Sequence, residues 1–377
     1  MPIDTSLVMR ARAAGEAIAP MLEEIETERR LPALAVEAIA SAGAFKVCVP
    51  RVFGGSQASA STMAAVIEEL ARIDGSAGWI AMIGATSGLM SVYLDEAVAR
   101  EIFSPADAVA CGVFAPMGRA TPISDGYRVT GRWPFASGCE HSRWRMGGAL
   151  VEGEQGVRSM VFAADQTTIH DTWKTSGLRG TGSHDMSVTD ANVPRERTFS
   201  LFTDPPRHAG YELSFFGVLA AGVASVGLGI ARAAVDTATH VMRTKLAPGA
   251  KRPQSHRELV QVEVARGEAR LRAARALLHE AIEAASSLAT SSAATDPKVL
   301  ASRAHLRLAA CHAATESAAV TAAMYELGGG AAIYSGNPLQ RQFRDAHVVT
   351  HHLMVSSTAL TMAGKVLLGV ETDVTML

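Results

Sequence analysis

Charged and titratable side chains gather near the C-terminal end of an otherwise apolar region, where Arg344 and Asp345 are followed by His347, His351 and His352. Adjacent residues on a helix point about 100° apart, so Arg344 and Asp345 need separate partners elsewhere in the fold. Counted from Asp345 at the helical period, His352 falls on the same apolar face. An inward imidazole can act as an acid or a base, or it can be a core histidine with satisfied hydrogen bonds.

The same histidines allow two further interpretations. His347 and His351 are one helical turn apart, which is also the spacing of a metal-binding pair. We predict no metal at this position. The sequence leaves open whether His351 or His352 faces the reacting centre.

Composition restricts the class of protein. The chain has 377 residues, of which 48% are hydrophobic, enough for two or three lobes. A net charge of −2, without a run of five basic residues, argues against nucleic acid or a membrane as partner and favours small molecules. The four cysteines are far apart and the N-terminus lacks a signal-peptide pattern, so we expect reduced thiols and a cytoplasmic location. The apolar stretch from Phe215 to Ala234 is predicted to be a buried core helix.

Hydrophobic periodicity divides the chain into three regions. We predict an N-terminal α-helical domain over residues 1–108, a middle small β-barrel or sandwich over 109–212, and a C-terminal four-helix bundle over 213–377. This is an α+β multidomain architecture. Loops are expected at 247–250 and 286–295. The expected strands are 108–113, 127–133, 144–151, 159–164 and 186–193, and the expected long helices are 214–245, 256–287, 297–327 and 340–368.

Five motifs, in this order, carry a resemblance to a known family. They are Arg30-Leu-Pro with Ala42-Gly-Ala and Val49-Pro-x-x-Phe-Gly-Gly55, Gly126-Tyr-Arg-Val-Thr-Gly-Arg-Trp-Pro-Phe-Ala-Ser-Gly138, Trp173-Lys-Thr-Ser-Gly-Leu-Arg-Gly-Thr-Gly-Ser183, Glu326-Leu-Gly-Gly-Gly330 and Arg344-Asp345. The chain resembles the acyl-CoA dehydrogenase superfamily over nearly its whole length. Within that superfamily it most resembles the hydroxylase components of two-component, reduced-flavin-dependent monooxygenases. The resemblance implies an acyl-CoA dehydrogenase-like fold.

The catalytic glutamate of the family separates its two branches. A dehydrogenase needs a carboxylate to remove the α-proton of a thioester. The family's spacing after the Arg-Asp pair puts this glutamate at about Leu353, and its alternative position falls near Phe215, with Glu212 three residues too early. Monooxygenase relatives carry a histidine seven residues after the aspartate. The resemblance therefore assigns a catalytic role to His352.

The resemblance also implies flavin-contacting residues. Ser137 matches a threonine that hydrogen-bonds the flavin N5, where a hydroxyl in a dry pocket slows the loss of a C4a-hydroperoxyflavin as peroxide. The alternative is a β-turn serine that satisfies its own backbone. The glycine loop near Arg179 can hold a flavin phosphate or ribityl chain, whereas Gly329 either caps a helix or contacts the flavin of a neighbouring subunit. The implied cofactor-binding residues are Phe135, Ser137, Arg179, Gly180, Thr181, Ser183 and Gly329.

These expectations combine into a homotetrameric, two-component flavin-dependent monooxygenase. Reduced FMN or FAD would come from a separate flavin reductase by diffusion, since no Rossmann nicotinamide motif is present. With O₂, the enzyme would oxygenate a small aromatic or heteroaromatic substrate, His352 holding the hydroperoxide or taking the substrate proton. The alternatives are an acyl-CoA dehydrogenase or oxidase and a non-catalytic helical assembly protein. The expected substrate-pocket residues are Thr86, Phe114, Pro116 and His141, although His141 can equally cap a strand.

Overall fold

The chain divides into two compact units in a computed structural model that describes residues 2–246, 249–293 and 296–377. The first unit comprises the residues up to Val66, Trp79–Thr175 and Arg179–Phe215. The second comprises Ile67–Gly78, Ser176–Leu178 and Phe216–Leu377. The domain boundaries expected at residues 108 and 212 stay a prediction.

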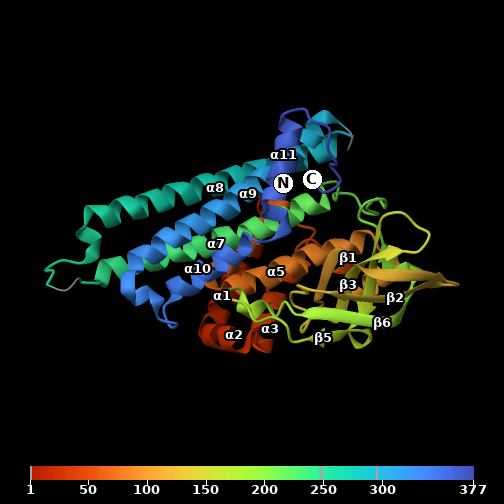
Figure 1. The fold of residues 1–377 in the computed structure, drawn as a ribbon, viewed down its shortest axis with the longest axis horizontal. Coiled ribbons are helices and arrows are strands. Elements are labelled where there is room, and N and C mark those ends of the chain that lie inside the picture. The colour runs from red at the N-terminus through yellow and green to blue at the C-terminus, as the bar shows by residue number, and fades with distance from the viewer. Residues whose placement is uncertain (1, 247–248, 294–295) are drawn as a thin grey trace. The chain divides into compact units, whose positions relative to one another are not determined.

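Short helices fill the N-terminal region, as the periodicity predicted (Figure 1). The Asp4 carboxylate caps the first of them by accepting the N–H groups of Ser6 and Leu7. Pro20 lies in a 3₁₀ turn that separates the first helix from the second. The helices are α1 (Thr5–Ile18), α2 (Leu22–Glu28), α3 (Ala33–Ser41), α4 (Ala60–Ile73), α5 (Gly75–Ser87) and α6 (Glu96–Phe103).

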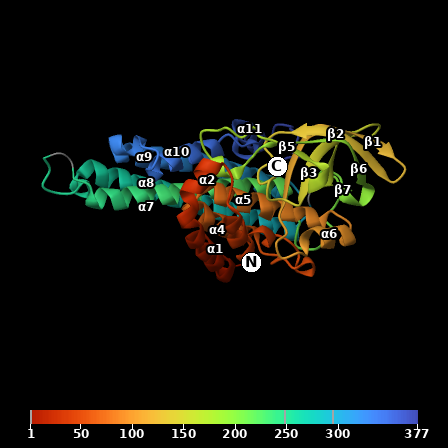
Figure 2. The ribbon, with the colours of Figure 1, turned by 90° about the horizontal axis from the view of Figure 1, so that it is seen from below.

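The β region of the first unit is one seven-stranded mixed sheet with the order β5-β6-β2-β1-β3-β4-β7. Strands β1, β2, β3 and β6 lie side by side in Figure 2. β1 pairs in parallel with β3, and its register shifts around Pro116, which lets the strand run longer than predicted. The strands are β1 (Ala110–Ile123), β2 (Gly126–Trp133), β3 (Trp144–Val151), β4 (Val157–Ala163), β5 (Thr168–His170), β6 (Asp185–Pro194) and β7 (Thr198–Phe199).

A fully buried tryptophan, Trp133, fixes the end of β2. Its Nε1 donates a hydrogen bond to the Gly148 carbonyl at 2.8 Å. A Cβ added at Gly118, Gly131 or Gly147 would lie 2.5 to 2.6 Å from the indole ring, so glycine on three neighbouring strands makes room for it. The turn that begins at Pro134 therefore leaves the sheet from a rigid position.

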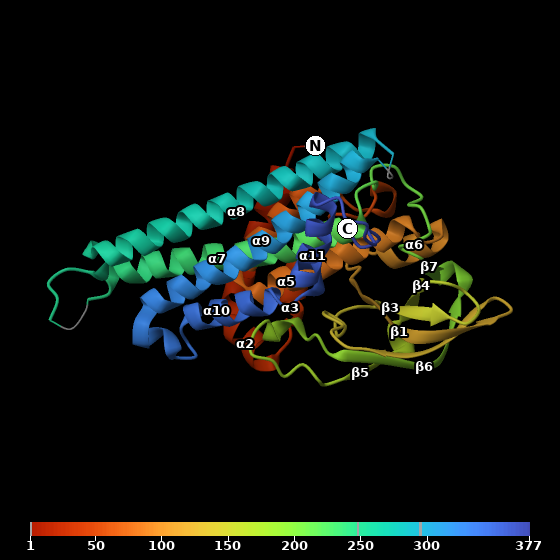
Figure 3. The ribbon, with the colours of Figure 1, turned by 45° about the horizontal axis from the view of Figure 1, so that its top comes forward.

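Long helices form the second unit, and α9 packs against α8, α10 and α11 (Figures 1 and 3). α7 is long and apolar enough to span a membrane by length and composition, yet 94% of its most apolar window is buried within the protein. This agrees with the predicted core helix. The bounds are α7 (Phe215–Thr244), α8 (Glu258–Ser291), α9 (Pro297–Gly328), α10 (Pro338–Val349) and α11 (Ser357–Leu367).

The fourth long helix was predicted wrongly as a continuous element over 340–368. α10 ends at Val349, a 3₁₀ turn follows at Leu353–Val355, and α11 begins at Ser357. The β-branched run Val348-Val349-Thr350 weakens the helix before the break. The loop expected at 286–295 starts later, because α8 continues to Ser291. Residues 247–248 and 294–295 of the two expected loops lie outside the described part of the chain.

Candidate functional site

Three buried hydroxyl groups form a hydrogen-bonded row in the first unit. Ser137 lies in the turn after Trp133, and its Oγ is 2.6 Å from the Oγ of Ser183. Ser183 in turn lies 2.6 Å from the Oγ1 of Thr181. Trp79 on α5 donates its indole N–H to Ser137 at 3.0 Å. The sequence motifs thus converge in space, and Ser137 is not a turn serine that bonds only to its own backbone.

The direction of the hydrogen bonds in this row determines whether Ser137 can donate to a further acceptor. Its oxygen already accepts the Trp79 N–H, and it accepts a second hydrogen bond when Thr181 donates to Ser183 and Ser183 donates to Ser137. In that arrangement the Ser137 proton points to an acceptor outside the row. The side chain is only 6% exposed, so such a bond would form away from bulk water.

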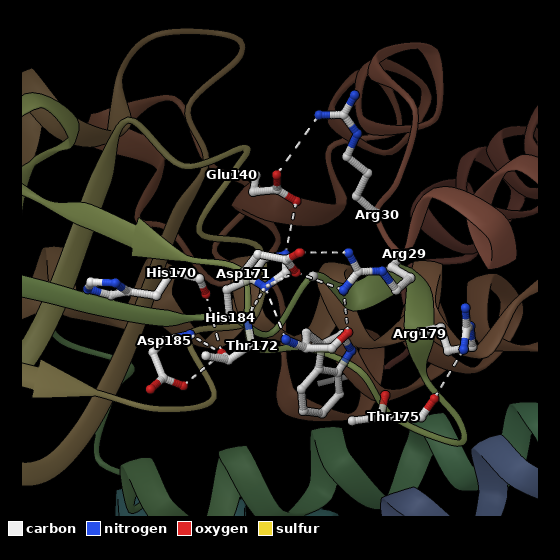
Figure 4. Close-up of polar contacts among 12 residues, drawn as sticks. Arg29, Arg30, Glu140, His170, Asp171, Thr172, Thr175, Arg179, His184 and Asp185 are labelled. Atoms are coloured by element: carbon white, nitrogen blue, oxygen red, sulfur yellow. Dashed lines mark hydrogen bonds and ion pairs between the residues drawn. The ribbon is translucent and has the colours of Figure 1, made fainter.

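His184 ties the neighbouring segments together, as Figure 4 shows. Its Nδ1 accepts the backbone N–H groups of Thr172 and Trp173, each at 3.2 Å, which places the ring proton on Nε2. The His184 carbonyl accepts the N–H of Ala136 at 2.9 Å. One histidine therefore fixes both the segment before the glycine loop and the turn that carries Ser137.

An ion-pair cluster surrounds this histidine. Arg29 donates hydrogen bonds to both carboxylate oxygens of Asp171, at 2.8 and 3.1 Å, and a further one to the Trp173 carbonyl (Figure 4). The hydrogen bond from Arg29 holds the pKa of the Asp171 carboxyl below its usual value. Glu140 lies 3.7 Å from the His184 Nε2. The cluster anchors the Trp173 segment from the side of α2.

Phe135 presents an aromatic ring to the surface beside this anchored segment. The side chain is 68% exposed, and its ring meets Trp173 edge-on at 6.2 Å between centroids. Its backbone has φ of 63°, a left-handed conformation that a residue with a Cβ adopts at a cost. An exposed aromatic ring held in a strained conformation, two residues from a buried hydroxyl, suits a planar ring ligand.

Two of the predicted cofactor residues have protein partners in the structure. Arg179 donates its Nε to the Glu26 carbonyl at 3.1 Å. Its Nη1 donates to the Thr175 carbonyl at 3.4 Å, as Figure 4 shows. Gly329, with φ of 59°, caps α9, as the simpler of its two interpretations predicted. A flavin contact stays a prediction for Arg179 and Gly329, and equally for Gly180, Thr181 and Ser183 of the glycine loop.

The predicted substrate-pocket residues have varied surroundings. The Thr86 hydroxyl donates to the Met82 carbonyl of its own helix at 2.8 Å. Phe114 packs edge-on against Phe215 at 5.1 Å, whereas Pro116 is exposed at the β1 irregularity. His141 is half-buried in the turn after Ser137, and burial lowers its pKa. Substrate contact by these four residues stays a prediction.

In the second unit, Arg344 and Asp345 hold one short segment from two sides. The Asp345 Oδ1 accepts the Leu178 N–H at 2.6 Å, and the Arg344 guanidinium donates to the Ser176 carbonyl. A Cβ at Gly177 would lie 2.6 Å from the Arg344 carbonyl, so only glycine permits this approach. Separate partners for the two charges were predicted, and the structure confirms them.

His352 lies after the end of α10 and not on the helical face from which its inward direction was predicted. Its Nδ1 accepts the Met354 N–H at 3.2 Å and caps the 3₁₀ turn. The residue is half-buried, while His351 is exposed. Burial lowers the pKa of His352 to about 4, and the charge of Arg307 adds to the effect. The ring is therefore neutral near pH 7 and carries its proton on Nε2.

His347, one of the two histidines considered for metal binding, has partners within its own helix. His347 donates its Nδ1 proton to the Phe343 carbonyl at 2.7 Å, and its ring packs on Phe343 at 4.2 Å between centroids. Within the described ranges, no group of three or more His, Cys, Asp and Glu side chains could hold a metal ion. The absence of a metal stays a prediction.

Sequence reasoning missed Trp79 and His184. Each acts through a partner that is distant in sequence, because Trp79 bonds to Ser137 and His184 bonds to Trp173. His184 directly follows the matched glycine motif, and this position was the available signal. Trp79 lies on an apolar helix, where an indole N–H needs an acceptor.

The residues of the first unit fit a flavin. Phe135 offers an exposed aromatic face, and Ser137 offers a hydroxyl group in a water-poor position. An isoalloxazine ring needs both an apolar surface and directed hydrogen bonds.

Comparison with known proteins identifies the family. Residues 8–101 match the model of the acyl-CoA dehydrogenase N-terminal domain, and residues 221–357 match that of the acyl-CoA dehydrogenase C-terminal domain. The indole-3-acetate monooxygenase of Pseudomonas putida is 34% identical over 92% of this chain and 90% of its own length. The chain therefore belongs to the acyl-CoA dehydrogenase superfamily and, within it, to the flavin-dependent monooxygenases, which are oxidoreductases.

Two further comparisons agree, one in enzyme class and one in fold. The oxygenase component of the FADH₂-dependent resorcinol hydroxylase of a Rhizobium species is 28% identical over 97% of this chain and 94% of its own length. The structure of XiaF from a Streptomyces species, solved with FADH₂ and glycerol, superposes with a TM-score of 0.88 at 27% identity. That superposition covers 97% of this chain and 96% of XiaF.

Proposed function

We propose that this chain is the oxygenase component of a two-component system, in which a separate flavin reductase supplies reduced FMN or FAD. A bound reduced flavin would supply the two electrons that activate O₂. In the balanced reaction, reduced flavin, O₂ and an aromatic C–H substrate give oxidised flavin, water and the C–OH product. One oxygen atom forms the new C–O bond, and the other leaves as water.

A neutral imidazole in place of a carboxylate carries this proposal. The segment 350–357 contains no Asp or Glu, and its one half-buried titratable side chain is His352, whose pKa burial lowers to about 4. Leu353, at the position expected for the glutamate of a dehydrogenase, is exposed. Removal of a thioester α-proton therefore lacks its base on this segment.

The described hydrogen bonds support distinct tasks for Ser137 and His352 in this proposal. In the direction in which Thr181 donates to Ser183 and Ser183 to Ser137, the Ser137 hydroxyl donates its proton out of the row. His352 carries its ring proton on Nε2, because its Nδ1 accepts the Met354 N–H. Of the two roles predicted for His352, holding an oxygen by donation therefore fits better than taking the substrate proton.

An aromatic substrate is part of the proposal. The relatives described above are named for the oxidation of indole-3-acetate and of resorcinol, both of them aromatic. A homotetramer in the cytoplasm completes the proposal, and analytical ultracentrifugation and cell fractionation test these two points. Gly329 would reach a neighbouring subunit only in such an assembly.

Isotopically labelled O₂ tests the proposed function. The protein is incubated with a flavin reductase, NADH, FMN or FAD, and a panel of indoles and phenols. We expect one labelled oxygen atom per product molecule. Product without label, or the same product formed when this chain is left out, would overturn the proposal. Bleaching of bound flavin by an acyl-CoA would instead support a dehydrogenase. No flavin dependence in any assay would support a non-catalytic assembly protein.

A further inference from the structure

α9 carries two arginines, Arg303 and Arg307, one helical turn apart, that have no carboxylate partner among the described residues. Arg307 is 1% exposed, and Arg303 is half-buried. The Nε of each is buried and has no hydrogen-bond acceptor among the described residues. Burial lowers the pKa of both, and no Asp or Glu contributes to either shift. A buried charge without a counter-ion is expensive, so this pair needs an explanation.

Other arginines of the same bundle are neutralised. Arg232 on α7 lies 2.5 Å from Glu268, and Arg270 on α8 lies 2.6 Å from Glu316. Both of those pairs are more exposed than Arg307, which keeps its charge in the most water-poor position of the three. Of these three arginines, Arg307 alone has no carboxylate partner in the described part of the chain.

Within the described ranges, the hydrogen-bond contacts of Arg307 are with neutral groups. Its Nη1 donates to the Phe216 carbonyl at 3.2 Å and lies 3.0 Å from the Met354 Sδ. A guanidinium has five N–H donors in one plane, and both of these contacts use the same nitrogen. The remaining donors form the fork that matches a carboxylate in two parallel hydrogen bonds.

This guanidinium lies close to His352. Met354 contacts both side chains, because its N–H bonds to the His352 Nδ1 and its sulfur meets Arg307. The Phe216 carbonyl belongs to the first turn of α7. The unpartnered cation and the imidazole to which the proposed function assigns oxygen binding thus share one corner of the second unit.

We propose that Arg307 binds the carboxylate of an aromatic acid, with Arg303 adding positive charge, so that the substrate supplies the counter-ion that the protein lacks. This inference rests on the proposed function for the aromatic part of the substrate. A carboxylate suits the site better than a phosphate, because a planar monoanion satisfies one guanidinium fork. The neutral His352 beside it adds no second cation.

Matched acids and amides test the site. The probes are indole-3-acetate and phenylacetate, each compared with its neutral amide of nearly equal shape. Calorimetry gives their dissociation constants for the full chain, with and without reduced FMN in the absence of oxygen. We expect the wild type to bind each acid more tightly than its amide. Tighter binding of the amides, or no binding of either acid, would overturn the proposal.

Substitutions separate recognition from a structural role. Arg307→Met should weaken acid binding roughly 10- to 100-fold, the range of one charge-assisted bidentate contact, and leave the amides unchanged. Arg307→Lys keeps the charge and should retain part of the affinity. Arg266→Met, which removes an exposed arginine of α8, is the control and should change nothing. Equal losses for acids and amides, with a lower melting temperature, would mean that Arg307 only supports the fold.

The two proposals fail in different ways. Arg307-dependent acid binding without any labelled product would leave the arginine site standing and would sink the proposed function. Oxygenation of neutral aromatic compounds, unaffected by Arg307→Met, would support the proposed function and would overturn the arginine site. Melting temperature provides a further check, because removing a buried charge that has no counter-ion should not destabilise the fold. A higher melting temperature for Arg307→Met agrees with the proposal.

Discussion

His352 should make the stability of this protein depend on pH in a defined window. Its folded pKa of about 4 lies below the ordinary histidine value of 6.5. Burial is the main cause, and the Arg307 charge is the second. Between these two pH values, His352 binds a proton in the unfolded chain but not in the folded chain. The stability due to the neutral ring is therefore present above about pH 6.5 and is lost as the pH falls toward 4.

The size of the effect follows from the same two values. A gap of about 2.5 pKa units corresponds to about 3 kcal/mol, at 1.36 kcal/mol per unit. The ring is partly exposed, and solvent screening reduces this to about 2 to 3 kcal/mol. A loss of that size is a large part of the stability of a typical domain.

His352→Asn isolates this contribution. The asparagine oxygen can still accept the Met354 N–H and cap the 3₁₀ turn, but the side chain no longer titrates. Urea unfolding is followed at several pH values in wild type and variant, and the difference between the two curves is compared. We expect the wild type to lose about 2 to 3 kcal/mol more than the variant on acidification. Parallel curves would refute the assignment of a buried neutral ring.

Three further predictions concern other parts of the structure. Ser137→Ala should raise the H₂O₂ released per O₂ consumed about 2- to 15-fold, the effect of one lost hydrogen bond. Ser142→Ala, which removes a buried hydroxyl that donates to the Gly138 carbonyl, should not. Equal coupling in both variants would assign Ser137 a structural role. Asp345→Ala should lower the free energy of unfolding by about 2 to 3 kcal/mol in urea titrations, since the buried Leu178 N–H loses its acceptor, and Asp345→Asn should cost less. Unchanged stability would show that this bond is dispensable. Burial raises the pKa of the four cysteines, so the native chain should resist iodoacetamide at about pH 8 by mass spectrometry, whereas the urea-unfolded chain should react at every site. Rapid modification of the native chain would contradict this burial. The four thiols belong to Cys48, Cys111, Cys139 and Cys311.

The order of elements was readable from the sequence because it depends on local spacing. Apolar residues at helical period predicted the helices before residue 103 and the long helices after 214, and alternating β-branched segments predicted five of the strands. β5 and β7 were missed, because two or three residues cannot show a period. The matched motifs assigned Ser137 and Ser183 to one set of flavin-binding residues, and the structure brings their hydroxyls within 2.6 Å of each other.

Partners that are distant in sequence were decided only by the tertiary structure. The chain itself shows that Asp345 needs a partner, but not that the partner is the Leu178 N–H, 167 residues away. Likewise, the helical pattern continued through His352, whereas the fold ends the helix at Val349 and turns that imidazole into a cap. Local propensities differ by fractions of a kcal/mol per residue, and long-range packing outweighs them. Whether Arg307 has a counter-ion depends on every helix packed around it, and the described residues supply none, which no local pattern could show.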